Sequence, residues 1–525
     1  MKKIFSGKLK TFNIYMIFFM LLYGLLIIRT AWISDDILLT FRTILNFTHG
    51  FGPTFNIAER VQVYTHPLWF LVLTTGYMVL RNISYATLLL SFVFSLLAFW
   101  LLLAKISCSK SWITLAALGL LFSKAFIDYS TSGLENPLSY FLLALLVLLV
   151  LKQKDNSEKD LLKIVFTVSM IFLNRMDLIL LTLPLLILAI YRINNIKSIL
   201  KAVSLGFLPI VLWLLFSLWY YGFPFPNTFY AKLGTGINKF ELIHQGFYYF
   251  LDSLSIDPIT LLLITFAVVL GFIYRSGLTI ALSTGIILYS LYILSIGGDF
   301  MSGRFFSVPL FGAAIILSRL PEIRLYKTIP LALLIILLGL GTKFPTLFCN
   351  HQYINPKIPH TGIADERGFY FPHRGLITAN RQRFLKFTKW TTSNNNPVSI
   401  DTRVEAGGLG FVAINDGPYV HHIDICGLAD PLLARLPATK KNWRIGHFHR
   451  KIPSGYQDSI KASYNLIEDK NLSKFYDKLR FITRGDLFSF SRFMIIIKMN
   501  LGLYDHLIEH VNSDQIVTKK MINKT

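Results

Sequence analysis

Charged residues are scarce in this chain, and acidic ones are the scarcest. Only 15% of the 525 residues are Asp, Glu, Lys or Arg, whereas 53% are hydrophobic and 14% are aromatic. Soluble globular domains carry about 25% charged residues. This balance excludes an ordinary soluble enzyme and predicts a polytopic α-helical membrane protein.

Basic residues outnumber acidic ones by 52 to 29, which gives a formal net charge of +23. Such a charge suits nucleic acid, lipid phosphates or the inner loops of a membrane protein. No helix-turn-helix, zinc-finger or RNA-recognition signature is present in the sequence. We therefore expect a membrane lipid environment and no nucleic-acid partner.

Cysteine and nucleotide-binding motifs are also rare or missing. There are three cysteines: Cys108 falls in an expected inner loop, and Cys349 and Cys426 fall in the C-terminal region. The spacing leaves a bridge between the last two open, because it does not fix their separation. Neither a P-loop nor a dinucleotide-binding glycine motif occurs, so no nucleotide-binding fold is expected.

Apolar runs long enough to cross ~30 Å of hydrocarbon occur at about eleven places. The run at 66–80 is shorter and contains Trp69 and Tyr77, so we place it along the outer interface. The first run is followed by no small-residue cleavage site and is expected to be an uncleaved span. The predicted spans lie near 12–31, 85–104, 111–127, 136–151, 161–174, 176–191, 199–220, 257–274, 277–296, 304–319 and 326–343.

The distribution of lysine and arginine orients these spans. Eleven crossings place the basic clusters at 2–10, 105–110, 152–163, 192–201 and 319–327 on the cytoplasmic side, as the positive-inside rule requires. An odd number of crossings carries the C-terminal region to the outer face. We thus predict a membrane domain over 1–343 and a soluble outer α+β domain over 344–525.

The first polar island between spans, "SDDILLTFR" at 34–42, carries two adjacent carboxylates. Asp35 and Asp36 could simply complement the N-terminus of a helix that Ser34 caps. Arg42 lies seven residues after Asp35, two helical turns along the same face. One face could therefore offer a carboxylate base and a phosphate-binding cation.

Four further islands are predicted to open to the same outer side: "YSTSGLENP", "NRMD", "PFPNTFYAK" and "GGDFMSGRF". Three glycines in the last island allow tight backbone geometry. Each charged residue in these islands could also be a solvated flank or half of a structural ion pair. As donor phosphate- or sugar-binding candidates we take Glu135, Arg175, Asn227, Lys232, Asp299 and Arg304.

The order of these motifs, followed by "DICGLADPLLAR" and "GHFHRKIPSGY", resembles the mycobacterial terminal arabinofuranosyltransferases and their bacterial relatives. These enzymes belong to the membrane-embedded C-type glycosyltransferases. The resemblance is piecewise but extends from about 31 to 456. It departs from the family pattern at "NRMD", where an Arg-Pro-Asp type of sequence is frequent, and at "YTHPLW", where His66 replaces a common Asn.

This resemblance implies a C-type glycosyltransferase in the bacterial inner membrane, with its N-terminus in the cytoplasm and a periplasmic C-terminal domain. A polyprenyl-phosphate-linked sugar, arabinofuranose by likeness, would be the donor and a cell-envelope glycan the acceptor. An acidic residue of the first outer loop is essential in the family, which here means Asp35 or Asp36. Asp424, Asp430 and Arg435 are expected on the acceptor side.

The sequence does not decide whether the site uses a metal ion, and it leaves two alternative functions, a transporter or flippase and an oligosaccharide ligase. A divalent ion bridging carboxylate and phosphate is compatible with such a site, and His421, His422 and "GHFHR" match no standard zinc spacing. A lipid-linked sugar transporter or flippase would also use intramembrane charges and glycine-broken helices. An oligosaccharide ligase would differ by having a large outer loop between late spans.

Overall fold

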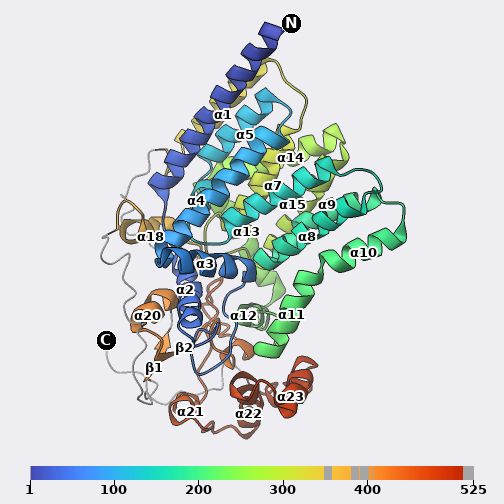
Figure 1. Cartoon of the computed structure of the whole chain (residues 1–525). Helices are drawn as coiled ribbons and strands as arrows, with labels where there is room; N and C mark the ends of the chain where they lie inside the picture. Colours follow the sequence, from blue (N-terminus) through green and yellow to red (C-terminus); the bar gives the residue numbers. More distant parts are fainter. Residues whose placement is uncertain (1, 348–357, 380–389, 391–400, 406, 512–525) are drawn as a thin grey trace. The chain divides into compact units, whose positions relative to one another are not determined.

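The computed structural model describes residues 2–347, 358–379, 390, 401–405 and 407–511, and these are mostly helical (Figure 1). The prediction of a helical protein is therefore confirmed. The chain divides into two compact units, which we describe one at a time. Unit 1 consists of Met1–Ser34, Leu71–Ile210 and Lys239–Phe384, and unit 2 of Asp35–Phe70, Val211–Asn238 and Leu385–Thr525.

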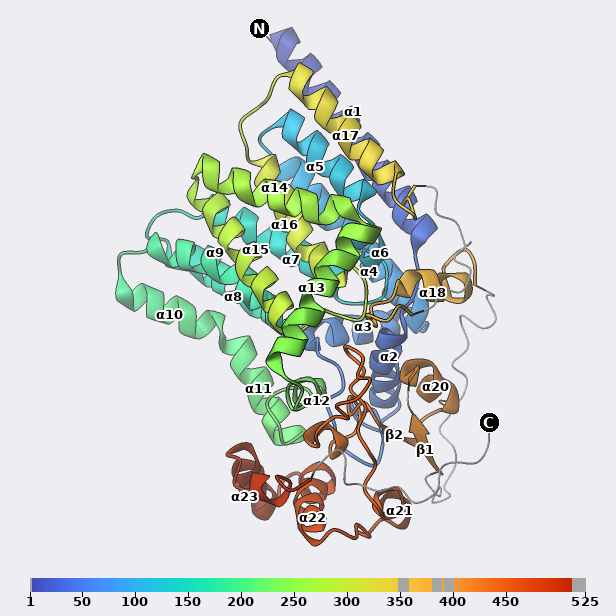
Figure 2. The same cartoon turned by 180° about the vertical axis from the view of Figure 1, so that it is seen from behind.

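Unit 1 is a bundle of apolar helices. In Figure 1, α7, α8 and α9 lie side by side, and Figure 2 shows α5 beside α17. The helices of this unit are α1 (Lys2–Thr30), α4 (Ile83–Leu101), α5 (Lys110–Phe122), α6 (Lys124–Tyr129), α7 (Asn136–Lys152), α8 (Glu158–Asn174), α9 (Ile179–Tyr191), α10 (Ile196–Gly206), α13 (Lys239–Ile256), α14 (Pro258–Tyr274), α15 (Gly277–Ser295), α16 (Ser307–Ser318), α17 (Leu325–Leu340) and α18 (Glu366–Arg374).

Polar side chains set the starts of many of these helices. The hydroxyls of Ser109, Ser123, Ser157 and Ser276 each accept a hydrogen bond from the backbone N–H three residues later, and the amide oxygen of Asn82 does the same for α4. This arrangement satisfies an N–H group that has no partner inside the helix. Short polar residues between apolar runs therefore fix where these five helices begin.

Two described helices, Ile83–Ile106 and Gly277–Ser295, are long and apolar enough to cross a membrane. Two bent pairs, α10 with α11 (Leu208–Tyr220; 41°) and α13 with α14 (108°), raise this number to four if each pair is one span. Further apolar helices of 10–17 residues include α3 (Pro67–Leu80), which the sequence placed along the interface. The count of eleven spans remains a prediction.

Residues 358–379 pack within unit 1. Trp32 forms an antiparallel bridge with Gly375, and the Arg367 guanidinium lies 3.0 Å from the Asp128 carboxylate. Lys124 is 3.1 Å from Asp365. Compact packing and membrane topology are different properties, so the division into a membrane domain over 1–343 and an outer domain over 344–525 remains a prediction.

Unit 2 contains a small parallel sheet. Strands β1 (Asp401–Glu405) and β2 (Val420–Asp424) pair from Asp401↔Val420 to Glu405↔Asp424. Parallel strands need a crossover, commonly a helix, and α20 (Leu409–Asp416) supplies it here. The carboxyl end of β2 leads into the loop 424–435, which carries all three predicted acceptor-side residues.

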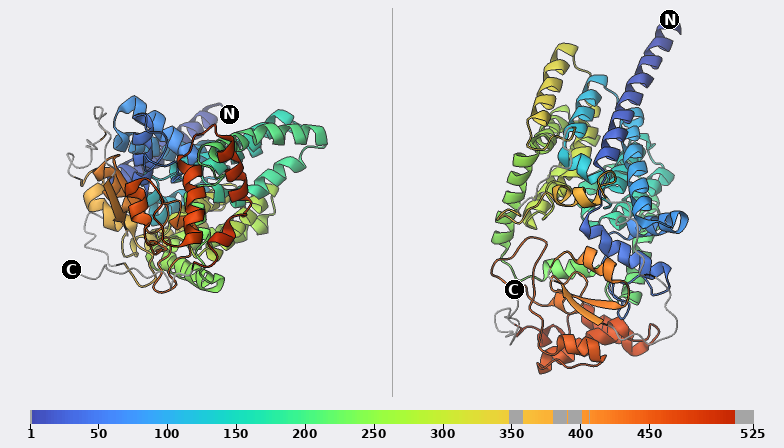
Figure 3. Two further views of the ribbon diagram at one scale, coloured as in Figure 1. Left: turned by 90° about the horizontal axis from the view of Figure 1, so that it is seen from below. Right: turned by 90° about the vertical axis from the view of Figure 1, so that its left-hand side faces the viewer.

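Two apolar clusters hold unit 2 together. Phe55, Val61 and Val63 pack with Leu409 and Ala413, and a larger cluster joins β2, the loop 424–435 and α22. Figure 3 shows α22 and α23 side by side. The remaining helices of this unit are α2 (Asp35–Thr48), α12 (Asn227–Leu233), α21 (Tyr456–Ala462), α22 (Lys470–Arg484) and α23 (Phe490–Asn500).

Close packing of α9 against α15 gives the first testable prediction. A Cβ atom at Gly285 would lie 2.0 Å from the Leu181 carbonyl oxygen, so alanine would push the two helices apart. We expect Gly285→Ala to destabilise the protein by about 1–3 kcal/mol, measured as a lower melting temperature in detergent. Gly407→Ala, where a Cβ would meet nothing within 4 Å, is the control; equal effects of the two changes would contradict this account.

Candidate active site

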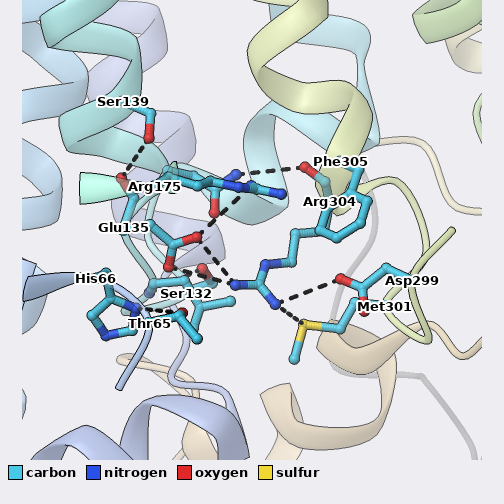
Figure 4. A network of polar contacts seen from close by, with 12 residues as sticks. Thr65, His66, Ser132, Glu135, Ser139, Arg175, Asp299, Met301, Arg304 and Phe305 are labelled. Carbon is cyan, nitrogen blue, oxygen red and sulfur yellow. Dashed lines mark hydrogen bonds and ion pairs between the residues drawn. The ribbon is translucent and has the colours of Figure 1, made fainter. Parts of the chain in front are cut away.

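A network of buried charges in unit 1 collects four of the predicted site residues. Glu135 immediately precedes α7, and Arg175 separates α8 from the short helix η2 (Met176–Leu178). Asp299 follows α15, and Arg304 begins η3 (Arg304–Phe306). Figure 4 shows that their side chains point toward one another. Three islands that are far apart in sequence therefore meet at one place.

Glu135 lies between the two guanidinium groups. Its carboxylate is 3.1 Å from Nη2 of Arg304 and 3.7 Å from Nη1 of Arg175. Arg304 also reaches Asp299 at 3.5 Å through Nη1. Buried charges are costly unless paired, and the Glu135 side chain is only 3% exposed. The glutamate therefore stabilises both arginines in the interior.

Arg175 is fixed on its other side by Asp177 and Tyr289. Its Nε and Nη2 donate to the Asp177 carboxylate at 3.0 and 3.1 Å. Nη2 also donates to the Tyr289 hydroxyl at 2.9 Å, which in turn donates to Asp177 at 2.8 Å. The Phe305 ring lies 4.5 Å from the guanidinium carbon. Arg175 is therefore held in one orientation.

The glycine-rich loop before Arg304 adopts the tight geometry predicted for it. Gly297, Gly298 and Gly303 have φ angles of 87°, 75° and 73°, a region that other residues rarely enter. A Cβ atom at Gly298 would also lie 2.5 Å from Tyr249. These glycines allow the chain to turn between α15 and η3 and to place Asp299 and Arg304 beside Glu135.

The two arginines of the network, Arg175 and Arg304, differ in how tightly they are held and in how exposed they are. Arg175 is engaged by a carboxylate through two nitrogens and by a tyrosine, whereas the contact of Arg304 with Asp299 is longer. The Arg304 side chain is also the more exposed of the two, at 12% against 7%. Arginine binds phosphate oxygens well. Arg304 is therefore the better candidate for an anionic ligand.

In unit 2 the two adjacent carboxylates, Asp35 and Asp36, begin α2. Asp35 accepts hydrogen bonds from the backbone N–H of Gly410 at 3.3 Å and of Phe411 at 2.8 Å, in the first turn of α20. Asp35 therefore complements two helix N-termini: that of α2, in which it lies, and that of α20. Asp36, one position on, is half-buried and projects about 100° further around α2.

Arg42 is fully buried and its nitrogens are directed at backbone carbonyls. Nε donates to Phe55 at 2.7 Å, Nη2 to Val420 at 2.8 Å, and Nη1 to Ala413. Burial lowers the pKa of Arg42 to about 9. These contacts tie α2 to α20 and β2, so the geometry favours a structural role over the phosphate contact that we expected from the sequence.

The side-chain amide of Asn227 is also engaged by other residues of the protein. Its Nδ2 donates to the carbonyls of Gly427, Leu428 and Asp430 at 2.8–3.2 Å, and its Oδ1 accepts from Arg435 at 3.2 Å. Asn227 thereby holds the loop 424–435 against α12. Lys232, at the end of α12, is exposed.

A pocket in unit 2 lies beside Asn227 and Arg435. The Arg435 guanidinium carbon is 3.9 Å from the Phe223 ring centre and 4.8 Å from that of Tyr230, so cation–π contacts hold it in place. Burial lowers the pKa of Arg435 to about 10. Its lining also includes Arg60, Gln62, Tyr221, Phe225 and Thr483, and its volume of about 10 Å³ is room for roughly one water molecule.

Asp424 and Asp430 are buried within their own loop. The Asp424 carboxylate accepts from the backbone N–H groups of Cys426, Leu428 and Ala429. Asp430 accepts from Leu432, Leu433 and the Tyr456 hydroxyl. Burial raises the pKa of both carboxyls, that of Asp430 to about 7. Both residues therefore shape the loop 424–435, and its place on the acceptor side remains a prediction.

The two histidines His421 and His422 are adjacent on β2 and are both buried. Burial lowers the pKa of His421 to about 4 and that of His422 to about 2, so both rings are neutral at pH 7. Within the described part of the chain, no group of three or more His, Cys, Asp or Glu side chains could hold a metal ion. Cys426 is buried, and Cys349, with which the sequence left a bridge open, lies outside the described residues.

Sequence reasoning missed two further charged clusters. Lys124 and Asp128 pair with Asp365 and Arg367 in unit 1. In unit 2, Glu59 is 3.3 Å from Arg484 and 3.5 Å from His421. The four-residue spacing of Lys124 and Asp128 in an apolar segment was a usable signal. Nothing local to Glu59 indicated partners more than 360 residues away.

Two curated proteins are similar to this chain over most of its length. A terminal beta-(1->2)-arabinofuranosyltransferase of Mycobacterium tuberculosis is 27% identical, covering 81% of this chain and 82% of its own. The protein of the same name from Corynebacterium glutamicum is 28% identical, covering 79% and 72%. The chain therefore resembles this enzyme family. No family model matches it, and no solved structure matches it either.

The raised pKa of Asp430 predicts a pH-dependent stability. The carboxyl titrates near pH 4 when unfolded and at about 7 when folded. Below about pH 4 the carboxyl is protonated in both states and does not change the free energy of unfolding. Between about pH 4 and 7 the unfolded state loses the proton first, so the free energy of unfolding falls as the pH rises. Asp430→Asn stays neutral, so its melting temperature relative to the unmodified protein should rise between pH 4 and 7.

Each kcal/mol corresponds to roughly 2–4 °C in a domain of 150–250 residues. Thermal unfolding in detergent at several pH values measures the difference between the two proteins. Asp458→Asn, in the neighbouring helix α21, is the control. A difference that does not change with pH would contradict the assignment.

Proposed function

We propose that this chain is a membrane-embedded glycosyltransferase that moves a sugar from a polyprenyl-phosphate carrier to a cell-envelope glycan. The observation that carries the proposal is the similarity, across about four-fifths of the chain, to two proteins named terminal beta-(1->2)-arabinofuranosyltransferase. Arabinofuranose is the sugar that this similarity favours. The many apolar helices of unit 1 support a place in the membrane.

The proposed location is the inner membrane of a bacterium, with the reaction on its outer face. Eleven spans would leave the N-terminus in the cytoplasm and residues 344–525 outside. The basic clusters in the predicted inner loops support this orientation. An active site on the outer face suits a carrier lipid that presents its sugar on that side of the membrane. The reaction then needs no nucleotide-linked sugar as donor.

The proposed reaction is an inverting displacement. The oxygen of an acceptor hydroxyl attacks the anomeric carbon, the bond to the carrier phosphate breaks, and the hydroxyl proton passes to a carboxylate. We assign the base to Asp36. Asp35 accepts two backbone N–H bonds from α20, which fix its side chain against that helix. Asp35 is the residue that positions α2 against α20.

For the leaving phosphate we assign Arg304, with Glu135 and Asp299 positioning its side chain. Arg175 acts through the network because Asp177 and Tyr289 hold it. Lys232 is a second, exposed cation for the donor. Asp36 belongs to unit 2 and Arg304 to unit 1. Their action on the same donor is a prediction from the sequence.

The acceptor side of the proposal rests on the loop 424–435. Asn227, Asp424 and Asp430 hold this loop in shape, and Arg435 lines the pocket beside it. Aromatic rings with a guanidinium group suit a glycan that offers C–H faces and oxygen acceptors. No step of the proposed mechanism passes through a metal ion, and a divalent metal stays an open question for experiment.

The assignment of the base predicts different outcomes for the two neighbouring aspartates. Asp36→Asn removes the proton acceptor but keeps the shape of the side chain, so sugar transfer should fall by ~10²–10⁴-fold without loss of carrier-lipid binding. Asp35→Asn should mainly lower the melting temperature. Transfer from a synthetic polyprenyl-phosphate sugar to an arabinan fragment measures the first effect.

Two results would count against this assignment. Full transfer by Asp36→Asn would remove Asp36 as the base. Continued translocation of the carrier-linked sugar across vesicles, with no transfer by either variant or by the unmodified protein, would favour a flippase.

Arg304 should contribute to the affinity for the carrier phosphate. A hydrogen bond to a charged group contributes about 1.5–3 kcal/mol, so Arg304→Gln should weaken inhibition by polyprenyl phosphate by roughly 10–100-fold. Arg304→Lys should restore part of it. Arg319→Gln, a cation at the end of α16, is the control. A lower melting temperature with an unchanged inhibition constant would show that Arg304 is only structural.

A further inference from the structure

The segment from α22 to α23 carries an unusual outer surface. Helix α23 buries Arg492, Ile496 and Met499, which lie on one face at a spacing of four and three residues. Its outward side is also apolar, although the solvent-facing side of a surface helix is normally polar. Phe488 and Phe490 are 83% and 75% exposed, and further exposed apolar residues are Phe493, Met494, Leu501 and Leu503.

This surface is firmly attached to the C-terminal end of α11. Arg492 donates from Nη1 to the carbonyl of Trp219 at 2.7 Å and from Nη2 to that of Tyr220 at 2.9 Å. The last carbonyls of a helix lack partners inside it, and a cation is favourable there. Asn500 adds a hydrogen bond to the Gly222 carbonyl at 2.8 Å.

The exposed face of α11 continues onto this surface. Leu212, Leu215 and Trp219 are spaced by three and four residues and are each at least 41% exposed. The Trp219 ring lies 5.8 Å from the ring of Phe488. An apolar stripe therefore runs along α11, passes through Trp219 and Phe488, and reaches α23.

The charge of the segment indicates what covers this stripe. Residues 470–503 contain seven basic and two acidic residues. Of the basic ones, Arg492 is buried and Arg484 pairs with Glu59, whereas Lys470, Lys474 and Lys498 are exposed. Phenylalanine and tryptophan beside lysine and arginine are typical of helices that lie in a membrane interface, where anionic lipids attract the cations.

We propose that the exposed face of α23, together with the turn at 485–489, inserts into the outer-leaflet interface of the membrane and binds anionic phospholipid there. The proposal rests on the proposed outer position of this region, in which α11 is part of a span. It assigns the end of the chain a second membrane contact, which would hold the loop 424–435 at the lipid surface through the shared core of Ile482, Leu432 and Leu433.

The experiment uses the full chain in vesicles that contain about one-third phosphatidylglycerol. An environment-sensitive fluorescent amino acid replaces Phe490 in one variant and Tyr464 in another, because Tyr464 is an exposed aromatic residue outside the stripe. Lipids with a nitroxide near the headgroup are the quencher. We expect several-fold stronger quenching at 490 than at 464, and weaker quenching at 490 when phosphatidylcholine replaces phosphatidylglycerol.

Equal quenching at the two positions would overturn the proposal. So would a change in fluorescence at 490 that follows the protein-to-vesicle ratio and not the nitroxide lipid, since that result would identify a second copy of the chain as the partner. The triple change Phe488→Ser, Phe490→Ser and Phe493→Ser should leave the melting temperature within a few degrees, because these side chains are exposed. Sugar transfer, measured on the same vesicles, reports separately on the proposed function.

Discussion

A guanidinium group that leaves water must be surrounded by oxygen atoms, and this constraint organises both units. In unit 1, Arg175, Arg304 and Arg367 are met by carboxylates. In unit 2, Arg42 and Arg492 are met mainly by backbone carbonyls. The arginines therefore connect segments that are distant in sequence. The chain is strongly basic overall, and several of its few acidic residues, including Asp128, Glu135 and Asp177, pair with these buried cations.

The two kinds of partner have different consequences for chemistry. The backbone carbonyls that Arg42 and Arg492 contact include several in segments distant in sequence, so these contacts favour a structural role for both arginines. A carboxylate can share its cation with an incoming phosphate, because both are anionic oxygen acceptors. The loose contact of Arg304 with Asp299, at 3.5 Å, is therefore the kind of contact that substrate could replace. The tight pairing of Arg175 with Asp177 favours orientation over binding.

Much of the helical content and the glycine-rich turn before Arg304 could be predicted from the sequence, because both follow from local pattern. The long apolar runs were harder to divide, since the structure bends between α10 and α11 at Phe207 and between α13 and α14 at Asp257. The partners of Arg42 could not be predicted. Ala413 and Val420 lie more than 370 residues away, and no local periodicity encodes such contacts.

The same limit explains why Asp35 and Asp36 could not be told apart from the sequence. Adjacent residues on a helix project about 100° apart, so a neighbouring element can engage one and leave the other a different environment. Here α20 takes Asp35 through two backbone N–H groups. These two contacts fix the Asp35 side chain and orient α2 against α20. The proposed chemistry also needs a carboxylate that accepts a proton during the reaction, and this is the role proposed above for Asp36.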